Sequence, residues 1–192
     1  MNETSKCKTK RVLNGDFERY LFGSGIDIGC GGDCLTVPNG SVRPWDKKDG
    51  DAQTMAGLAD SSFDFVYSSH CLEHLIDVEH ALRAWVRILK PRGRVYIVVP
   101  DYLYYEKMTW PSRFNGDHKH SFSETVGRSQ VGRENHWNIA VDLAPVLRRS
   151  DIAVREARLE TDGYDFNRGM EDQTMKLALS QIVIVGDLID PA

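Results

Sequence analysis

The sequence contains no hydrophobic run long enough to cross a bilayer, and residues 1–12 are polar and rich in lysine. A membrane protein is therefore not expected, and residues 1–12 have no apolar core of the kind that marks a secretory leader. The chain also lacks an excess of charge of one sign, because 24 Lys and Arg stand against 28 Asp and Glu. This balance favours neither a membrane surface nor a nucleic acid as partner. We expect a cytoplasmic protein.

Cysteine is scarce, with four residues in 192, and they lack the paired CxxC spacing of zinc or redox centres. We expect free thiols in a reducing compartment. No internal repeat or low-complexity block is present. The composition, 41% hydrophobic and 27% charged, is that of an ordinary globular protein with one core. We expect one domain over residues 1–192, in which residues 1–12 form a flexible tail.

One stretch, residues 25–32, combines a short apolar run, a single acid and a set of glycines. Ile26 and Ile28 are β-branched and favour a buried strand, and they flank Asp27. The glycines that follow allow a positive φ and a close approach of a ligand to the backbone. A glycine loop at the carboxyl end of a strand is where open α/β sheets bind ligands. The stretch therefore predicts both an α/β fold and its site.

The rest of the chain alternates strand and helix patterns. The clearest helix is capped by Asp77 and presents an apolar face up to Leu89, and the nearly continuous apolar run that follows predicts a strand buried on both faces. Strand, helix and strand in this order imply a right-handed parallel crossover. Between the glycine loop and the next strand there is no room for a full helix. The expected elements are short helices at 17–22 and 139–149 and strands at 42–45, 63–67, 95–99, 154–159 and 179–185.

Residues 101–137 are a long connection that is rich in aromatic and polar side chains. Long irregular connections inside a compact domain are usually functional or disordered, and this one contains too many aromatics for disorder. We predict that it forms a lid over a substrate.

An ordered set of motifs resembles the class I S-adenosylmethionine-dependent methyltransferases, at residues 25–31, 50–52, 61–69, 72–75 and 89–95. The resemblance implies an α/β, Rossmann-like methyltransferase sheet that is mostly parallel with an antiparallel closing strand, and S-adenosyl-L-methionine as cofactor. Between residues 32 and 63, helices and possibly a whole strand are missing, so we expect a sheet shortened on one side. A partner copy, the N-terminal segment or the lid must cover the exposed surface, and a homodimer is expected.

The resemblance also implies a set of cofactor-binding residues. Asp27 offers a carboxylate to the ammonium group, Asp46 suits the ribose hydroxyls, and Asp51 suits the adenine amino group. Trp45 is equally consistent with stacking on the purine and with a place in the core. The expected set is Asp27, Gly29, Cys30, Gly31, Trp45, Asp46, Asp51, Ala52, Ser69 and His70.

Two other motif readings are weaker. A dinucleotide-binding fingerprint fails because Cys34 stands where its third glycine belongs. His70 to His74 match the HxxEH pattern of metalloproteases, but that chemistry needs both histidines on one helical face, and this stretch precedes the helix cap at Asp77. Asp117, His118 and His120 could also hold a divalent ion. We expect no metal.

Methyl transfer to oxygen requires a base or a metal to accept or displace the hydroxyl proton. His120, His118 and His70 are the expected catalytic residues, with His120 ranked first as base. The Asn-Pro-Pro-aromatic signature of many members that modify amines and bases is absent after residue 67, so a nucleic acid acceptor is not expected. We predict O-methylation of a small molecule or saccharide. The alternatives are N-methylation of a small molecule or peptide, and a non-catalytic S-adenosylmethionine-binding partner subunit.

Overall fold

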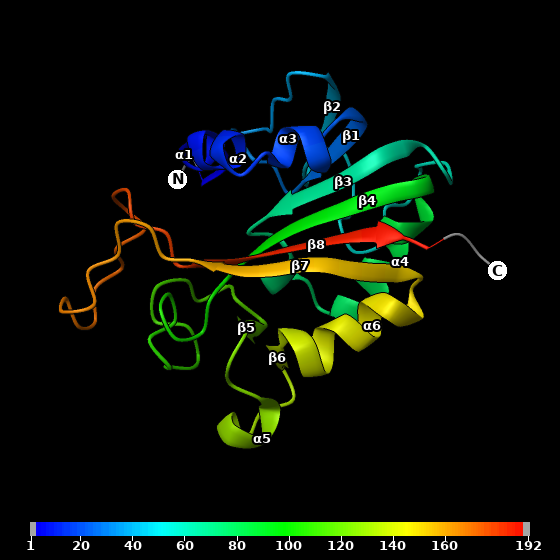
Figure 1. Ribbon diagram of the computed structural model, residues 1–192. Helices are drawn as coiled ribbons and strands as arrows, with labels where there is room; N and C mark the ends of the chain where they lie inside the picture. The colour runs from blue at the N-terminus through cyan, green and yellow to red at the C-terminus, as the bar shows by residue number, and fades with distance from the viewer. Residues whose placement is uncertain (1–2, 190–192) are drawn as a thin grey trace.

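The computed structural model describes residues 3–189, and within them six strands form one sheet in the order β2-β1-β3-β4-β8-β7 (Figure 1). The strands β2, β1, β3 and β4 are mutually parallel, whereas β8 is antiparallel to both β4 and β7. The fold class is therefore confirmed as a mostly parallel Rossmann-like sheet with an antiparallel closing strand. Its strands are β1 Gly23–Ile28, β2 Gly40–Trp45, β3 Phe63–Ser69, β4 Leu89–Pro100, β7 Ile152–Glu160 and β8 Gln181–Leu188.

The central strands are buried on both faces, as their apolar runs predict. In β4, every residue from Val95 to Val99 is buried, and β8 is buried from Gln181 to Val185. All the strands expected from the sequence are present, most of them longer by a few residues at one or both ends. Side chains that alternate along a buried strand must meet a covering layer on each side of the sheet.

Helix α4, Val78–Arg87, covers one face. Asp77 caps it by accepting a hydrogen bond from the His80 amide at 2.9 Å, and its buried residues include Leu82 and Trp85. A π-helical turn, Ile139–Leu143, continues into α6, Ala144–Arg149, where the second amphipathic helix is expected. The remaining short elements are the 3-10 turn Leu72–His74, β5 Ser121–Ser123, α5 Arg128–Val131 and β6 His136–Asn138.

The sheet is shortened at its β2 edge, as the sequence predicts. Within residues 3–189, no helix lies between β1 and β2 or between β2 and β3. The edge strand β2 is largely exposed and contains Pro44, a residue that edge strands tolerate because it cannot donate to a further strand.

The N-terminal segment differs from the expected tail. Residues 3–13 form two helices, α1 Glu3–Lys6 and α2 Lys8–Leu13, that lie beside the sheet (Figure 1). Arg11 is buried, donates hydrogen bonds to the Thr4 carbonyl and the Tyr67 hydroxyl, and stacks over the Tyr67 ring. The tail prediction is therefore wrong for these residues, while Met1 and Asn2 lie outside the described part of the chain.

The helix expected at 17–22 is observed as α3, Asp16–Arg19. Its Phe17 is buried in a cluster with Phe65 and Tyr67 of β3, and Asp16 accepts hydrogen bonds from the Tyr96 hydroxyl at 2.8 Å and from Arg158 at 2.6 Å. The helices α1 to α3 thus cover the face of the sheet opposite α4. No helix among residues 3–189 is long and apolar enough to span a bilayer.

We predict that Phe17→Ala lowers the free energy of unfolding by about 3–5 kcal/mol, because a fully buried ring leaves a cavity when truncated. Urea denaturation of the two proteins measures the difference. The matched control is Phe166→Ala, whose ring is 67% exposed and whose loss should cost far less. Equal effects of the two substitutions would contradict the packing of α3 on the sheet.

Candidate active site

Three cavities lie close together in the described part of the chain, at the end of the sheet where β1, β3 and β4 finish (left in Figure 1). Their volumes are about 440, 320 and 340 Å³. His70, the residue that follows β3, lines all three. Its φ of 55° is in the left-handed region, which costs free energy for a residue other than glycine. This strained residue is the junction of the cavities.

The glycine loop separates the 440 Å³ cavity from the 320 Å³ cavity. Gly29 has a φ of 78°, and a Cβ atom there would lie 2.5 Å from the Cβ of Cys71, so only glycine fits. Gly31, with a φ of 53°, faces the Asp46 carboxylate across the loop. The backbone of the loop is therefore open to a ligand on both sides.

Most of the expected cofactor residues line these two cavities. On the 440 Å³ side, Asp51 accepts a hydrogen bond from the Gln53 amide, and the Ala52 carbonyl accepts one from Trp85 Nε1 at 2.7 Å, which ties this turn to α4. The residues from the expected set are Gly29, Asp46, Asp51, Ala52 and His70 on that side, and Gly29, Cys30, Gly31, Ser69 and His70 on the other.

Asp27 lies behind the loop and lines none of the three cavities. It is 1% exposed, and its Oδ2 accepts a hydrogen bond from the Leu35 amide at 2.6 Å, which closes the loop from below. Burial raises the pKa of Asp27 to about 7, with Asp33 and Asp46 adding to the effect and the Leu35 amide and Arg11 opposing it. The structure therefore gives Asp27 a position that supports the loop, and direct contact with the cofactor ammonium is not shown.

Trp45 is part of the hydrophobic core, so the stacking role considered for it is corrected. Its ring is 3% exposed and lies under Gly50, where a Cβ atom would be 2.6 Å from the indole. A large side chain at the end of β2 is buried by the turn that follows, and it does not line the described cavities.

The fold brings together two of the three histidines that are expected to be catalytic and places the third elsewhere. His70 and His118 line the 340 Å³ cavity, but His120 lines none of the three. His120 Nδ1 accepts a hydrogen bond from Trp137 Nε1 at 3.1 Å, its Nε2 lies 3.2 Å from the Ile76 carbonyl, and burial lowers its pKa. The first-ranked base is therefore corrected, because His120 faces Trp137 and Ile76 and none of the three cavities.

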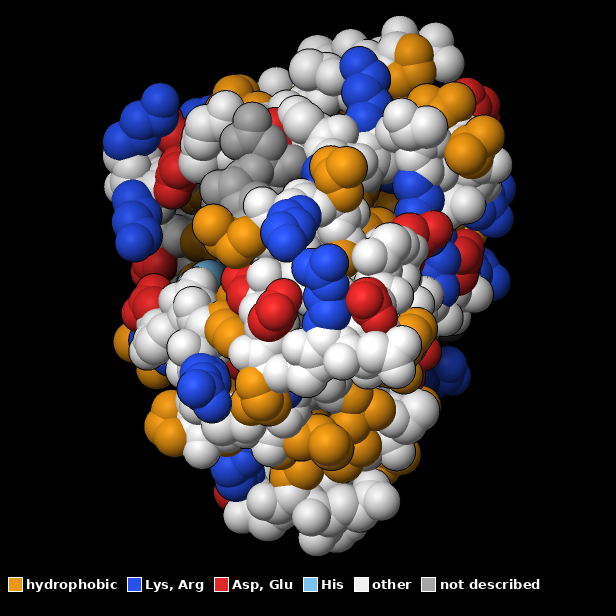
Figure 2. Space-filling model, turned by 90° about the vertical axis from the view of Figure 1, so that its left-hand side faces the viewer, with side chains coloured by type: hydrophobic (Ala, Val, Ile, Leu, Met, Phe, Trp, Pro, Cys, Tyr) orange, Lys and Arg blue, Asp and Glu red, His pale blue; other side chains and the backbone are white. Residues whose placement is uncertain are grey.

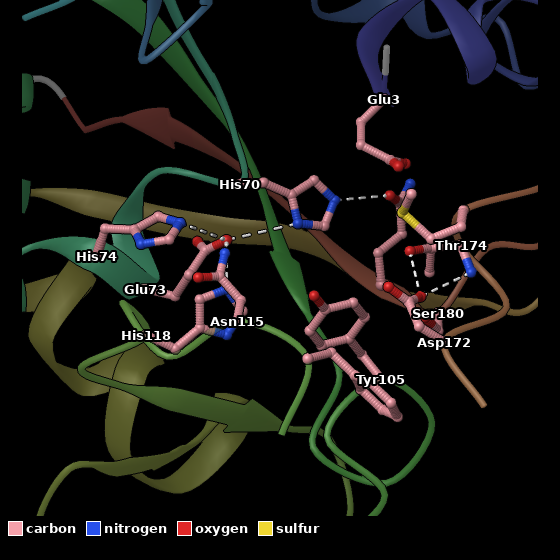
Figure 3. A pocket seen from close by; sticks show the side chains of 13 residues that line it. Glu3, His70, Glu73, His74, Tyr105, Asn115, His118, Asp172, Thr174 and Ser180 are labelled. Atoms are coloured by element: carbon pink, nitrogen blue, oxygen red, sulfur yellow. Dashed lines mark hydrogen bonds and ion pairs between the residues drawn. The ribbon is translucent and has the colours of Figure 1, made fainter. Parts of the chain in front are cut away.

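The 340 Å³ cavity is built from four separate parts of the chain (Figure 3). The segment expected to be a lid contributes Tyr105, Asn115 and His118, while α1 and the loop between β7 and β8 contribute Glu3 and Asp172. In the space-filling view of this end, a histidine side chain is visible between hydrophobic and acidic side chains (Figure 2). Sequence reasoning missed Glu3 and Asp172, because only the fold brings them to His70.

Glu73, which follows β3 on the 3-10 turn, was also missed. Its carboxylate is fully buried, and the nearest imidazole nitrogens are His70 Nδ1 at 3.5 Å and the Nε2 atoms of His74 and His118, each 3.9 Å away (Figure 3). Burial favours the neutral carboxyl, but the surrounding histidines hold the pKa of Glu73 below its usual value. Conversely, burial opposes protonation of His70, but Glu73 raises the pKa of that imidazole.

All four cysteines are free thiols, as expected. Two of them, Cys30 and Cys34, have their sulfur atoms 2.8 Å apart beside the glycine loop.

Several solved structures share this fold. A candidate methyltransferase from Bacillus halodurans aligns with a TM-score of 0.60 over 92% of this chain and 98% of its own, at 11% identity. A complex of the Trm112 methyltransferase activator with a candidate methyltransferase, from Haloferax volcanii, gives 0.56 over 98% and 94%, at 15% identity. The 1,6-didemethyltoxoflavin-N1-methyltransferase of Burkholderia thailandensis, solved with S-adenosylhomocysteine, gives 0.55 over 97% and 80%, at 15% identity. At these identities the likeness shows the fold.

The family model of a methyltransferase domain matches residues 35–97, which include β2, β3, α4 and most of β4. This match covers the segments that follow the glycine loop on the same sheet. The matched domain and the fold are those of the class I S-adenosylmethionine-dependent methyltransferases. Both findings support an enzyme, with S-adenosylmethionine as the expected cofactor. No curated protein matches this chain significantly by sequence.

We predict that Asp27→Ala weakens S-adenosylmethionine binding at least about tenfold, because the loop loses the acceptor that holds the Leu35 amide. Isothermal titration calorimetry measures the affinity. Asp27→Asn is the matched variant, since its amide oxygen still accepts that hydrogen bond, and it should bind much better than Asp27→Ala. Unchanged affinity in Asp27→Ala would remove Asp27 from the cofactor site.

The raised pKa of Asp27 also predicts a pH dependence of stability without cofactor. A carboxyl whose pKa rises from about 3.9 in the unfolded chain to about 7 in the fold makes the free energy of unfolding fall as pH rises through this window, by up to about 4 kcal/mol. Asp27→Asn has no such proton to lose. Urea denaturation at pH 5 and pH 8 should therefore show a larger advantage of the variant at pH 8, and a constant difference would contradict the shift.

Proposed function

We propose that the enzyme transfers a methyl group from S-adenosylmethionine to a hydroxyl oxygen of a small polar molecule or a saccharide. The observation that carries the proposal is the 340 Å³ cavity, which meets both glycine-loop cavities at His70. Aromatic and polar side chains line it together, as sites for small polar ligands require.

The lining of the two glycine-loop cavities supports one orientation of the cofactor. The 440 Å³ cavity suits adenosine, because Asp46 and Asp51 can accept hydrogen bonds from the ribose hydroxyls and the adenine amino group. The 320 Å³ cavity suits the amino acid tail, with the backbone of Gly31 and the side chain of Ser69 on its walls. The bound cofactor would supply an electrophilic methyl group, and His70 would lie beside it because this residue lines both cavities where they meet the third.

Transfer by in-line displacement depends mainly on aligning the acceptor with the methyl group and on excluding water. His70 lies between the cofactor cavities and the acceptor cavity, where its imidazole can contact the acceptor hydroxyl. Tyr105 and Asn115 from the lid segment and Asp172 from the loop between β7 and β8 offer hydrogen bonds that orient a polyhydroxyl acceptor.

The walls of the acceptor cavity also favour a small acceptor over a macromolecule. Residues 101–137 and the loop after β7 both line the cavity, which supports the proposal that residues 101–137 form a lid over the acceptor. The homodimer stays a prediction: α1 to α3 already cover one face of the shortened flank, which weakens the reason for it.

We predict that His70→Ala lowers kcat about 100-fold or more while the affinity for S-adenosylmethionine changes far less, because general acid–base groups contribute about 10²–10⁴-fold. The measurement is formation of S-adenosylhomocysteine with a panel of sugars, phenols, small amines and peptides. His80→Ala, an exposed histidine on α4, is the control and should keep wild-type turnover.

The acceptor panel distinguishes the alternatives. Methylated hydroxyl products support the proposal, whereas turnover confined to amines would replace it with N-methylation. Tight cofactor binding with no turnover on any acceptor would indicate a non-catalytic partner subunit.

A further inference from the structure

Glu73, His74 and His118 form a cluster between the acceptor cavity and the adenosine side of the cofactor site. One ligand atom from each lies within 4.8 Å of the others. Glu73 Oε1 is 3.9 Å from His74 Nε2 and 3.9 Å from His118 Nε2. Two imidazoles and one carboxylate around an open position are the ligand type of zinc and other first-row transition metals.

The other nitrogen of each histidine is held by a carboxylate. His118 Nδ1 lies 2.6 Å from Oε1 of the buried Glu106, and His74 Nδ1 lies 3.2 Å from Oδ2 of Asp117. A carboxylate on Nδ1 fixes the tautomer that places a lone pair on Nε2, and ligating histidines are oriented in this way. Both lone pairs are therefore directed to the side of Glu73 (Figure 3).

The carboxylate of Glu73 supplies an independent observation. Its side chain is 0% exposed, and neither oxygen has a hydrogen-bond partner among residues 3–189. A buried carboxylate without hydrogen bonds costs several kcal/mol unless it is paired or binds a metal. The backbone carbonyl of Glu73 accepts bonds from the Lys119 and His120 amides, which fixes the segment carrying His118 against it.

We propose that Glu73, His74 Nε2 and His118 Nε2 bind one divalent transition-metal ion, with Zn²⁺ as the best match. Ligand atoms of a tetrahedral zinc site stand about 3.3 Å apart at bond lengths near 2.0–2.1 Å. The cluster must therefore contract by about 0.5–1.5 Å, which small side-chain rotations provide. The HxxEH pattern, which is set aside on sequence grounds, where no metal is expected, is used in part: Glu73 and His74 take part, but the second histidine comes from residues 101–137.

The ion faces the acceptor cavity. His118 and Glu73 line that cavity, and His74 lines it together with the 440 Å³ cavity. His70 Nδ1 lies 3.5 Å from Glu73 Oε1, so His70 is the neighbour of the proposed ion on the side of the cofactor cavities. The proposed metal site is independent of the proposed methyl transfer. Metal binding is measured without any acceptor, so the result of that measurement does not depend on turnover.

The test is metal binding by the untagged full-length protein after chelator treatment and dialysis. Zn²⁺ is titrated by calorimetry, and Co²⁺ is added as a spectroscopic probe, because its visible absorption reports the coordination geometry. One Zn²⁺ per chain is expected, and Co²⁺ should give a tetrahedral spectrum with nitrogen and oxygen ligands. Mg²⁺ should bind far more weakly, since it prefers oxygen ligands.

The variants assign the site. Glu73→Gln and His118→Asn should each abolish the one-per-chain binding, and Glu106→Gln should weaken it about 10–100-fold through the orientation of His118. His80→Ala and the double variant Cys30→Ser, Cys34→Ser should bind as the wild type does, which excludes a surface imidazole and the thiol pair. Circular dichroism and thermal melting identify any variant that fails to fold, and Glu106→Gln then carries the test.

The proposal is overturned if the wild type binds no Zn²⁺, or if Glu73→Gln and Glu106→Gln both bind it unchanged. Binding that disappears only in the thiol variant would place the metal at Cys30 and Cys34, and a preference for Mg²⁺ would exclude a histidine-rich site.

Discussion

The connection from β1 to β2 is too short for a helix, and much of this structure follows from that constraint. Residues 29–39 alone join the two strands, so the face of the sheet that a crossover helix would cover needs another layer. The segment before β1 supplies it. Because Phe17 and Leu21 pack on β3 and β4, the chain just before them is held close to the sheet, and α1 reaches the strand ends. The missing helix and the presence of Glu3 at the cavity therefore have one cause.

The same constraint explains which parts of the fold could be predicted. The β-branched and aromatic composition of residues 63–67 and 95–99 is enough to predict buried strands. Asp77, as a local N-cap, is enough to predict where α4 begins. The N-terminal helices carry no such signal. Arg11 is buried because Tyr67 and Tyr96 surround its guanidinium, and those partners lie 56 and 85 residues further along the chain. In the sequence, the same lysine- and arginine-rich stretch has the composition of a solvated tail.

The site shows a similar division. Gly29, Asp46 and His70 follow strands, and parallel strands end at one edge of a sheet, so their proximity was predictable. Trp45 and His120 have amphipathic side chains, which are equally suited to contact a ligand or to pack in the interior. In the fold both are buried. The approach of His118 to Glu73 depends on the path of an irregular segment, which no periodicity encodes. Ordered motifs thus predicted residues that line the two glycine-loop cavities, while the 340 Å³ cavity required the fold.

His70 connects these two sides, and its backbone indicates that the connection is under functional constraint. A φ of 55° would suit glycine or asparagine better, and strained residues of this kind persist where the surroundings hold them and cluster at functional sites. Here Glu73 lies beside one ring nitrogen, and Gln181 Oε1 lies 3.2 Å from the other. These two residues come from the turn after β3 and from the start of β8. The ring is thus fixed between the antiparallel closing strand and the turn that carries Glu73. A change in the position or charge of the Glu73 carboxylate therefore acts directly on the His70 imidazole, where the three cavities meet.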